Sequence, residues 1–250
     1  MFSLDNKTAY ITGGSSGIGR AVAETYIAAG ARVVIADISD ASQVAKEIGA
    51  HYVYVNVADE ASVADSLEQA QSLLGKLDIL VLNAGVGDVG PSLQETEQAL
   101  IDKVTKVNQF GVIYGLKHGP ARMNDGGSII STSSMAAAIS LVGSGVYSAT
   151  KRAVVSLTEM AALELGARGI RVNAVCPGYV ATALGSGEEG RKICEAFTAL
   201  GRVATTDDLI GVYQFLASDA SRYVTGQALC VDGGWSCGPT SQLLELVIGS

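Results

Sequence analysis

Short, uninterrupted apolar runs alternate with helical patterns along this chain, and no other feature constrains the fold more. A strand that is apolar without alternation is buried on both of its faces. Strand–helix–strand alternation favours right-handed crossovers and a parallel sheet. We therefore predict an α/β fold: one doubly wound (Rossmann-type) parallel sheet of about seven strands with helices on both faces. The predicted strands are Thr8–Thr12, Arg32–Ala36, Tyr52–Val57, Leu77–Leu82, Ser128–Thr132, Arg171–Val175 and Ala228–Val231.

No linker, internal repeat or low-complexity segment interrupts this pattern, so residues 1–250 are expected to form a single domain. Helices are expected at Gly19–Ala29, which Gly30 follows as a C-terminal cap should, and at about Ala61–Leu74. Pro177 to about Gly190 is predicted to be irregular, as part of a mobile substrate loop over about 179–198, because loops of this length in a compact domain are often functional.

A glycine-rich turn follows the first predicted strand directly. It reads Thr12-Gly13-Gly14-Ser15-Ser16-Gly17-Ile18-Gly19, and a helical pattern comes next. Glycines allow the backbone to approach a phosphate, and a helix N-terminus offers free N–H groups and a positive dipole end. The spacing Gly-x-x-x-Gly-x-Gly differs from the common dinucleotide fingerprint, but its place after the first strand of a doubly wound sheet predicts a dinucleotide site.

Asp37 ends the second predicted strand, about 20 residues beyond the glycine turn. A carboxylate there can accept hydrogen bonds from both ribose hydroxyls of the adenosine half, and it would repel a 2′-phosphate. Ser15 and Ser16 stand where a basic residue could bind that phosphate. The predicted cofactor is therefore NAD rather than NADP. The alternative is that Asp37 only caps a turn.

Tyr147 and Lys151 lie four residues apart, and Ser134 lies thirteen residues upstream of Tyr147. An i,i+4 pair shares one helix face, so an ammonium there can lower the tyrosine pKa from about 10 toward the neutral range. Such a phenol is a usable general acid or base, and a nearby serine could hold a carbonyl oxygen. On its own, the pair could equally be a half-buried ring beside a solvated amine.

The bulk composition limits the partners and the compartment. The net charge is −8 and no Lys/Arg cluster exceeds two residues, which argues against nucleic acid or an anionic membrane. No apolar run approaches the roughly 20 residues of a membrane span, and the N-terminus does not read as a signal peptide. The four cysteines lack a metal-binding spacing and the two histidines are far apart, so no metal site is predicted. We expect reduced thiols and a cytoplasmic protein.

Taken together and in order, these motifs resemble the short-chain dehydrogenase/reductase family, in its single-domain branch of about 250 residues. The resemblance runs from Lys7 to Gly234. Besides the glycine turn, it rests on Asn83-Ala84-Gly85, on Lys106-Val107-Asn108, on Pro177-Gly178 with Thr182 and on Val231-Asp232-Gly233-Gly234. It implies the catalytic residues Asn108, Ser134, Tyr147 and Lys151. It implies cofactor contacts by Gly13, Ser15, Ser16, Gly17, Ile18, Gly19, Asp37, Asn56, Val57, Asn83, Ala84, Gly85, Tyr147, Lys151, Pro177, Gly178, Val180 and Thr182.

The resemblance also implies hydride transfer between a substrate carbon and the nicotinamide, with Tyr147 as general acid/base activated by Lys151 and by the oxidised ring. Ser134 would steady the substrate oxygen, and Asn108 would hold a water that links Lys151 to solvent. Asn56 stands where the family has an aspartate, and Leu82 precedes Asn83 where the family has an asparagine. Neither departure is expected to matter for activity.

The expected substrate is a small uncharged secondary alcohol or its ketone, because the residues expected to face it are apolar. These residues are Met135, Ile139, Leu141, Val142, Leu184 and Phe197. Arg191 and Lys192 are expected to face solvent. Two other functions stay open: a ketoacyl-type reductase of carrier-linked chains and a catalytically silent NAD-binding regulator. The resemblance implies a homotetramer. The tail 235–250 could dock on its own subunit, form a subunit contact or cover a neighbouring active site.

Overall fold

The sheet organises the computed structural model, which describes residues 2–87, 92–182 and 188–249. In this part of the chain seven strands lie in the order β3-β2-β1-β4-β5-β6-β7, and every neighbouring pair is parallel. The strands are β1 (Thr8–Thr12), β2 (Arg32–Asp37), β3 (His51–Tyr54), β4 (Leu77–Leu82), β5 (Met123–Thr132), β6 (Arg171–Pro177) and β7 (Ala228–Val231). The predicted Rossmann-type sheet is confirmed.

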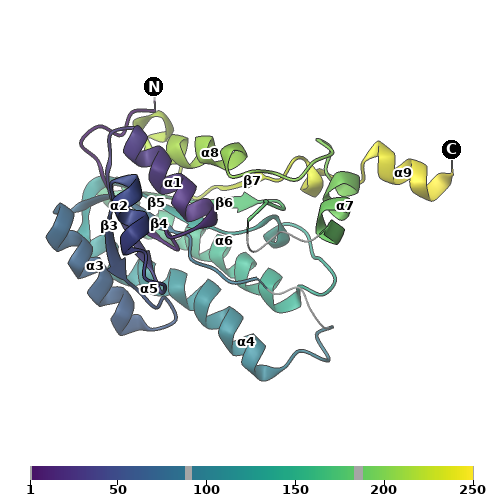
Figure 1. The fold of residues 1–250 in the computed structure, drawn as a ribbon, viewed down its shortest axis with the longest axis horizontal. Coiled ribbons are helices and arrows are strands. Elements are labelled where there is room, and N and C mark those ends of the chain that lie inside the picture. The colour runs from purple at the N-terminus through teal and green to yellow at the C-terminus, as the bar shows by residue number, and fades with distance from the viewer. Residues whose placement is uncertain (1, 88–91, 183–187, 250) are drawn as a thin grey trace.

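Helices connect the strands and cover the sheet (Figure 1). The α-helices are α1 (Gly17–Ala28), α2 (Ser42–Ile48), α3 (Glu60–Leu74), α4 (Gln98–Thr105), α5 (Gly111–His118), α6 (Gly145–Leu165), α7 (Glu188–Phe197), α8 (Asp207–Ala217) and α9 (Ser241–Ile248). Shorter helical turns are η1 (Lys106–Phe110), η2 (Pro120–Arg122), η3 (Met135–Ala137), η4 (Gly166–Arg168), η5 (Asp219–Ser221) and η6 (Trp235–Cys237).

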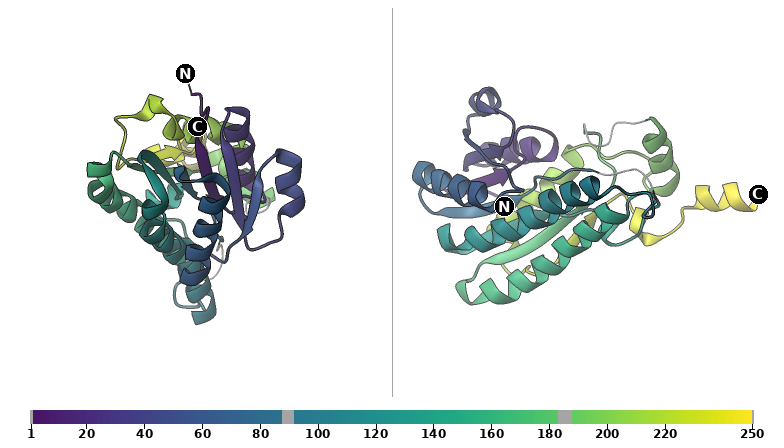
Figure 2. Two further views of the ribbon diagram at one scale, coloured as in Figure 1. Left: turned by 90° about the vertical axis from the view of Figure 1, so that its left-hand side faces the viewer. Right: turned by 90° about the horizontal axis from the view of Figure 1, so that it is seen from below.

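Two apolar cores lie on opposite faces of the sheet, as uninterrupted apolar strands require. On one face, α1 and α8 pack with Val22, Tyr26 and Leu216 against strand residues such as Ile11 and Ile35. The other face is covered by α3, α5 and α6, and their buried side chains include Leu67, Val112 and Val154. Figure 2 shows these helices from two further directions. Successive strand residues thus point into different cores.

The strand order reverses direction between β1 and β4, which are neighbours in the sheet although two strands separate them in sequence. In open parallel sheets, ligands bind outside the carboxyl ends of the strands at such a switch point. β1 ends at Thr12 and β4 at Leu82, so the glycine turn and Asn83-Ala84-Gly85 leave the sheet side by side.

The structure differs most from the predicted elements at three places. β3 spans His51–Tyr54, because the chain then turns at Asn56, whose side-chain oxygen accepts from the N–H of Ala58 (3.1 Å). β5 begins at Met123, which pairs with Leu77 of β4 before a register shift, and the amide of Asn124 donates to the Asp78 carboxylate (2.9 Å). Residues 188–197, predicted to be loop, form α7, and its Arg191–Glu195 pair (3.2 Å) has the i,i+4 spacing that supports a helix. Residues 183–187, including Leu184, lie outside the described residues.

The C-terminal helix α9 extends away from the rest of the chain beyond α7 (Figures 1 and 2). Leu244, Val247 and Ile248 on it are exposed. The tail therefore does not bury these residues on its own subunit. None of the helices that the structure describes is long and apolar enough to cross a membrane.

Candidate active site

The glycine turn after β1 closes tightly because its glycines occupy conformations and spaces that other residues could not. Gly13 (φ 66°) and Gly17 (φ 53°) have left-handed backbone angles. A Cβ at Gly19 would collide with the carbonyl oxygen of Gly13. The turn leads directly into α1, which starts at Gly17, and Ser16 makes no side-chain cap there. The first N–H groups of α1 are thus available for an anion, as a pyrophosphate would need.

Asp37 lies opposite this turn, at the end of β2. One of its carboxylate oxygens accepts from the Ser15 hydroxyl (2.6 Å) and from the Ser15 N–H (3.2 Å). The other accepts from the N–H of Ser39 (3.0 Å). Ser15 therefore joins the acidic strand end to the glycine turn. Asn56 and Val57 follow β3 in a turn, and Val57 packs against Gly111.

Asn83 braces the site from inside the protein. Its amide nitrogen donates to the carbonyl oxygens of Thr12 (3.1 Å) and Gly13 (3.3 Å). Its amide oxygen accepts from the Thr132 hydroxyl (3.0 Å). The Thr12 hydroxyl in turn accepts from the N–H groups of Asn83 (3.0 Å) and Ala84 (3.1 Å). The side chain predicted to touch the cofactor thus links β1, β4 and β5 at their carboxyl ends.

Asn108 lies in η1, a single π-helical turn between α4 and α5. Its amide pairs with the backbone of Val86, accepting from the N–H (2.8 Å) and donating to the carbonyl oxygen (2.9 Å). A Cβ at Gly85 would lie 3.3 Å from the Asn108 side-chain oxygen and 3.4 Å from Lys151 Nζ. Asn108 and Lys151 therefore converge on the backbone of Gly85.

Tyr147 and Lys151 lie on the first turns of α6, on one helix face as predicted. Lys151 Nζ lies 5.6 Å from the centroid of the Tyr147 ring. The ammonium is buried and donates to the carbonyl oxygen of Thr132 (2.9 Å) at the end of β5. The Ser133 hydroxyl donates to the carbonyl oxygen of Lys151 (2.8 Å), which fixes α6 to the same strand end.

The pKa values of the pair differ from the sequence-based prediction. Burial raises the pKa of Tyr147, and a hydrogen bond with Ser134 lowers it only in part. The expected lowering by Lys151 is therefore wrong for this structure. Burial also lowers the pKa of Lys151 to about 8. Loss of solvation acts against the charged form of each group, and it is the largest cause of both shifts.

Ser134 follows β5 and begins η3, where its hydroxyl oxygen accepts from the N–H of Ala136 (3.1 Å). It is buried beside Tyr147. At the end of β6, Gly178 donates its N–H to the carbonyl oxygen of Val231 (2.9 Å). Val180 forms an isolated bridge with Ala204, and Thr182 lies across from Gly17, whose Cβ would be 3.5 Å from its methyl group. The segment after β6 thus faces the glycine turn.

The residues expected to face the substrate are only partly together. Met135 is buried, and Ile139 and Leu141 pack beside it in one apolar cluster. Val142 is fully exposed, so its predicted inward position is wrong. Phe197 retains 36 % exposure at the end of α7. Arg191 and Lys192 point to solvent, as predicted, in ion pairs with Glu195 and Glu188.

Two residues near the site were not anticipated from the sequence. The hydroxyl of Tyr213, on α8, lies 2.7 Å from that of Thr132. Trp235 stacks on Phe197, with ring centroids 5.5 Å apart. Neither residue stands in a recognisable pattern, so only the folded chain reveals these contacts.

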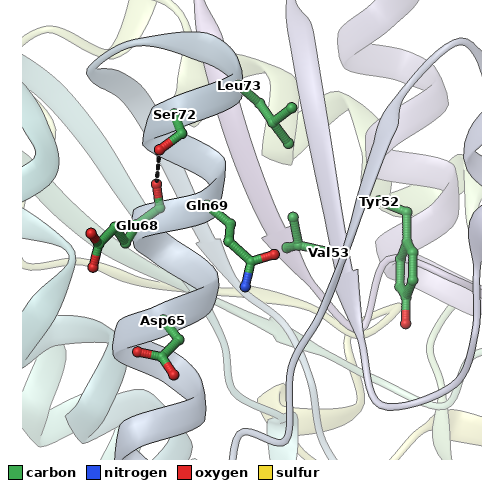
Figure 3. A pocket seen from close by; sticks show the side chains of 7 residues that line it. All are labelled: Tyr52, Val53, Asp65, Glu68, Gln69, Ser72 and Leu73. Carbon is green, nitrogen blue, oxygen red and sulfur yellow. Dashed lines mark hydrogen bonds between the residues drawn. The ribbon is translucent and has the colours of Figure 1, made fainter.

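A separate hollow of about 640 Å³ lies between β3 and α3 (Figure 3). Its lining consists of Tyr52, Val53, Asp65, Glu68, Gln69, Ser72 and Leu73. None of these is a predicted site residue, and two are acidic. The candidate active site is instead the carboxyl ends of the strands, where Ser134, Tyr147, Lys151 and the start of α1 all lie. Among the described residues, no group of three or more His, Cys, Asp or Glu side chains could hold a metal, and all four cysteines are free.

Comparisons with known proteins match this architecture over most of the chain. A family model described as "Enoyl-(Acyl carrier protein) reductase" matches residues 13–236. The mitochondrial borneol dehydrogenase of Lavandula x intermedia is 42 % identical over 239 residues, which cover 93 % of this chain and 92 % of that protein.

Solved structures agree. A short-chain type dehydrogenase/reductase from Mycobacterium marinum superposes with a TM-score of 0.90 at 37 % identity, covering 95 % of this chain and 98 % of that one. A blue fluorescent protein from a metagenomic library, in complex with NADPH, gives a TM-score of 0.88 at 33 % identity, covering 93 % and 99 %. This chain belongs to the short-chain dehydrogenase/reductase family of oxidoreductases.

Proposed function

We propose that this chain is an NAD-dependent oxidoreductase that interconverts a secondary alcohol and its ketone, with Tyr147 as the general acid/base. One observation carries the proposal: Ser134, Tyr147 and Lys151 lie together at the carboxyl end of β5, and Lys151 approaches Gly85, whose neighbour Ala84 packs against the glycine turn. In the oxidation, the alcohol and NAD give the ketone, NADH and a proton.

The residues at the carboxyl ends of the strands suit a dinucleotide. The glycine turn has no room for a Cβ at Gly14 or Gly19, and it opens on the N-terminus of α1, which would hold the pyrophosphate. Pro177, Gly178, Val180 and Thr182 would hold the carboxamide end. A bound NAD would supply the hydride acceptor and a positive ring charge. No metal is required by this scheme.

Proton transfer is the part assigned to the chain itself. In the oxidation, the phenolate oxygen of Tyr147 takes the hydroxyl proton of the alcohol, and in the reduction the phenol returns it. The Ser134 hydroxyl donates to the substrate oxygen as charge develops on it. Because burial raises the pKa of Tyr147 in the free protein, the phenolate needs added positive charge nearby.

Lys151 supplies part of that charge while it remains protonated, below its pKa of about 8. It would also bind the nicotinamide ribose. Asn108 converges with it on Gly85, and its proposed water would pass protons from Lys151 to solvent.

Asp37 supports NAD over NADP. Its carboxylate, oriented by Ser15 and Ser39, would accept hydrogen bonds from the two ribose hydroxyls and would repel a 2′-phosphate. Arg20, close to the turn, is a basic residue that could bind the 2′-phosphate of NADP. Its guanidinium is instead paired with Glu24 (2.9 Å) and Glu47 (3.6 Å).

A small uncharged substrate agrees with the apolar cluster beside Ser134. Borneol, which the Lavandula relative is named for, is such an alcohol. The carrier-linked alternative draws support from the description of the family model, but the net charge of −8 opposes an acidic carrier protein. We further propose a cytoplasmic homotetramer of single-domain subunits.

The direct test incubates the purified protein with NAD or NADP and a panel of secondary alcohols, including 2-propanol, cyclohexanol and borneol. NADH formation is followed by its absorbance. Turnover with NAD supports the proposal. NADH binding without turnover of any alcohol in the panel, or of the corresponding ketones with NADH, would favour the regulator.

A further inference from the structure

A third apolar cluster lies outside the two cores that sandwich the sheet. Its buried members are Met135 of η3, Cys194 of α7 and Trp235 of η6, and Tyr179 and Val203 pack against it. Met135 directly follows Ser134, which is proposed to hold the substrate oxygen. The cluster therefore joins three segments that are distant in sequence at the substrate end of the site.

Trp235 holds the C-terminal end of α7 in this cluster. Its ring stacks on Phe197 at a centroid distance of 5.5 Å and an interplanar angle of 28°. The backbone around it adds polar contacts. The N–H of Leu200 donates to Gly233 (3.1 Å), and the Thr240 hydroxyl donates to the carbonyl oxygen of Ala196 (2.6 Å).

The position of Trp235 is itself set from the cofactor side. The Asp232 carboxylate accepts from the N–H groups of Gly234 (3.0 Å) and Ser236 (2.9 Å), which fixes the turn that carries the indole. Asp232 packs so closely on Gly178 that a Cβ there would lie 2.8 Å from its Cα. One rigid turn thus links the segment proposed to hold the nicotinamide to the end of α7.

We propose that Trp235 is a positioning residue that determines substrate specificity: through Phe197 it sets the apolar wall against which the carbon skeleton of the alcohol packs. This rests on the proposed function. Trp235 is only 8 % exposed, whereas Phe197 keeps 36 % exposure, so the indole supports the phenyl ring from behind. Without that support the ring loses its fixed orientation, and a bulky substrate loses a contact that a small one never makes.

The experiment compares Trp235→Ala, Trp235→Phe, Phe197→Ala and the double alanine variant, with cyclohexanol as the bulky alcohol and 2-propanol as the small one. Phe2→Ala is the matched control, because Phe2 is also 36 % exposed and also pairs with an aromatic ring, Phe215 at 5.9 Å. Steady-state kinetics give KM and kcat separately, and NADH binding is titrated by fluorescence.

Trp235→Ala and Phe197→Ala are each expected to raise the KM for cyclohexanol about tenfold, and to change that for 2-propanol less than about twofold. The kcat and the affinity for NADH stay near wild type. Trp235→Phe keeps the KM for cyclohexanol close to the wild-type value. The double variant is no worse than either single one, since Trp235 acts through Phe197. Equal losses with both alcohols, the same KM rise in Phe2→Ala, or additive effects would overturn the inference.

A second measurement does not depend on turnover. Trp235 is the only tryptophan in the chain, so protein emission excited at 295 nm reports it alone. Cyclohexanol added to the NADH complex should shift this emission in the wild type and in Phe2→Ala at similar concentrations. In Phe197→Ala the half-saturating concentration of cyclohexanol should be several times higher. If no alcohol is oxidised, the proposed function fails. The emission shift would still support the apolar wall that Trp235 and Phe197 are proposed to form. A wild-type emission that ignores cyclohexanol overturns it.

Discussion

The hydroxyl of Ser15 donates to the carboxylate of Asp37 across 2.6 Å, so the glycine turn and the acidic end of β2 form one unit. Asp37→Ala removes the group that would accept the ribose hydroxyls and repel a 2′-phosphate. We expect NADH affinity to fall about tenfold or more, and NADPH affinity to hold or rise. Fluorescence titration with the two reduced cofactors measures this. Asp40→Ala is the control, since it removes a nearby exposed carboxylate that accepts hydrogen bonds from Ser42. Unchanged NADH affinity in Asp37→Ala would show that the Asp37 carboxylate does not select the cofactor.

Tyr147→Phe keeps the ring on α6 and removes only the hydroxyl. Because proton transfer by a positioned side chain contributes on the order of 10²–10⁴ in rate, we expect kcat to fall by about that factor. NADH binding should persist, which titration of the same sample checks. Tyr223→Phe, at a fully exposed tyrosine outside the site, should keep its turnover. A Tyr147→Phe enzyme with wild-type kcat would contradict the general acid/base role.

Lys151 should make stability depend on pH. Its pKa is about 8 in the folded protein, against an ordinary value of 10.5. Between these two values the unfolded chain binds more protons, so the free energy of unfolding rises with pH across this window. Below pH 8 the folded state carries the full cost of the buried ammonium.

Lys151→Met should therefore stabilise the protein at pH 7 by up to about 3 kcal/mol, less the lost hydrogen bond to Thr132, and activity should be lost. The advantage shrinks toward pH 10. Urea denaturation of both proteins at pH 7 and pH 10 tests this, with the exposed Lys103→Met as control. Parallel stability curves for wild type and Lys151→Met would refute the lowered pKa.

Tyr213 offers a test of the brace behind the site. Its hydroxyl lies 2.7 Å from that of Thr132, which donates to Asn83 and through it reaches the glycine turn. Tyr213→Phe should cost about 1–2 kcal/mol of stability and weaken NADH binding severalfold, because Thr132 loses a partner that fixes the hydroxyl on which Asn83 depends.

Tyr26→Phe is the matched control for this variant. Tyr26 is equally buried in the same core, but its hydroxyl donates to the backbone of Tyr213 (3.0 Å) and has no such link to Asn83. It should lose similar stability and keep its NADH affinity. Equal losses of affinity in the two variants would mean that the effect comes from general loosening.

The sheet could be predicted because its signal is local: each apolar run identifies a strand without reference to its neighbours. β1, β4 and β7 have the bounds read from the sequence. The end of β3 could not be predicted, because apolar Val55 and Val57 flank Asn56, whose hydrogen bonds with Ser62 and Ala58 end the strand. α7 was missed because the glycines around it indicate a loop, while its i,i+4 ion pairs appear only once it is helical.

From the sequence, only the types of the candidate site residues and their order along the chain could be predicted. Tyr147 and Lys151 share a helix face, as their spacing requires. Their pKa values were not accessible, because burial depends on the strands and helices packed around them. Asn83 shows the same limit, since its amide bonds residues of β1 and β5 and the turn after β1. Trp235 meets Phe197 only because the chain after β7 returns beside α7.

The sheet ends on both sides in a strand of four residues, β3 at one border and β7 at the other. A long unpaired border is a template for joining other chains, and short borders offer it little length. The longer, apolar interior strands are paired on both sides, so their backbone groups are not available for pairing with another chain. Concentrated solutions of this protein should form no β-rich aggregates while it stays folded, and misassembly should require that β3 or β7 first detach.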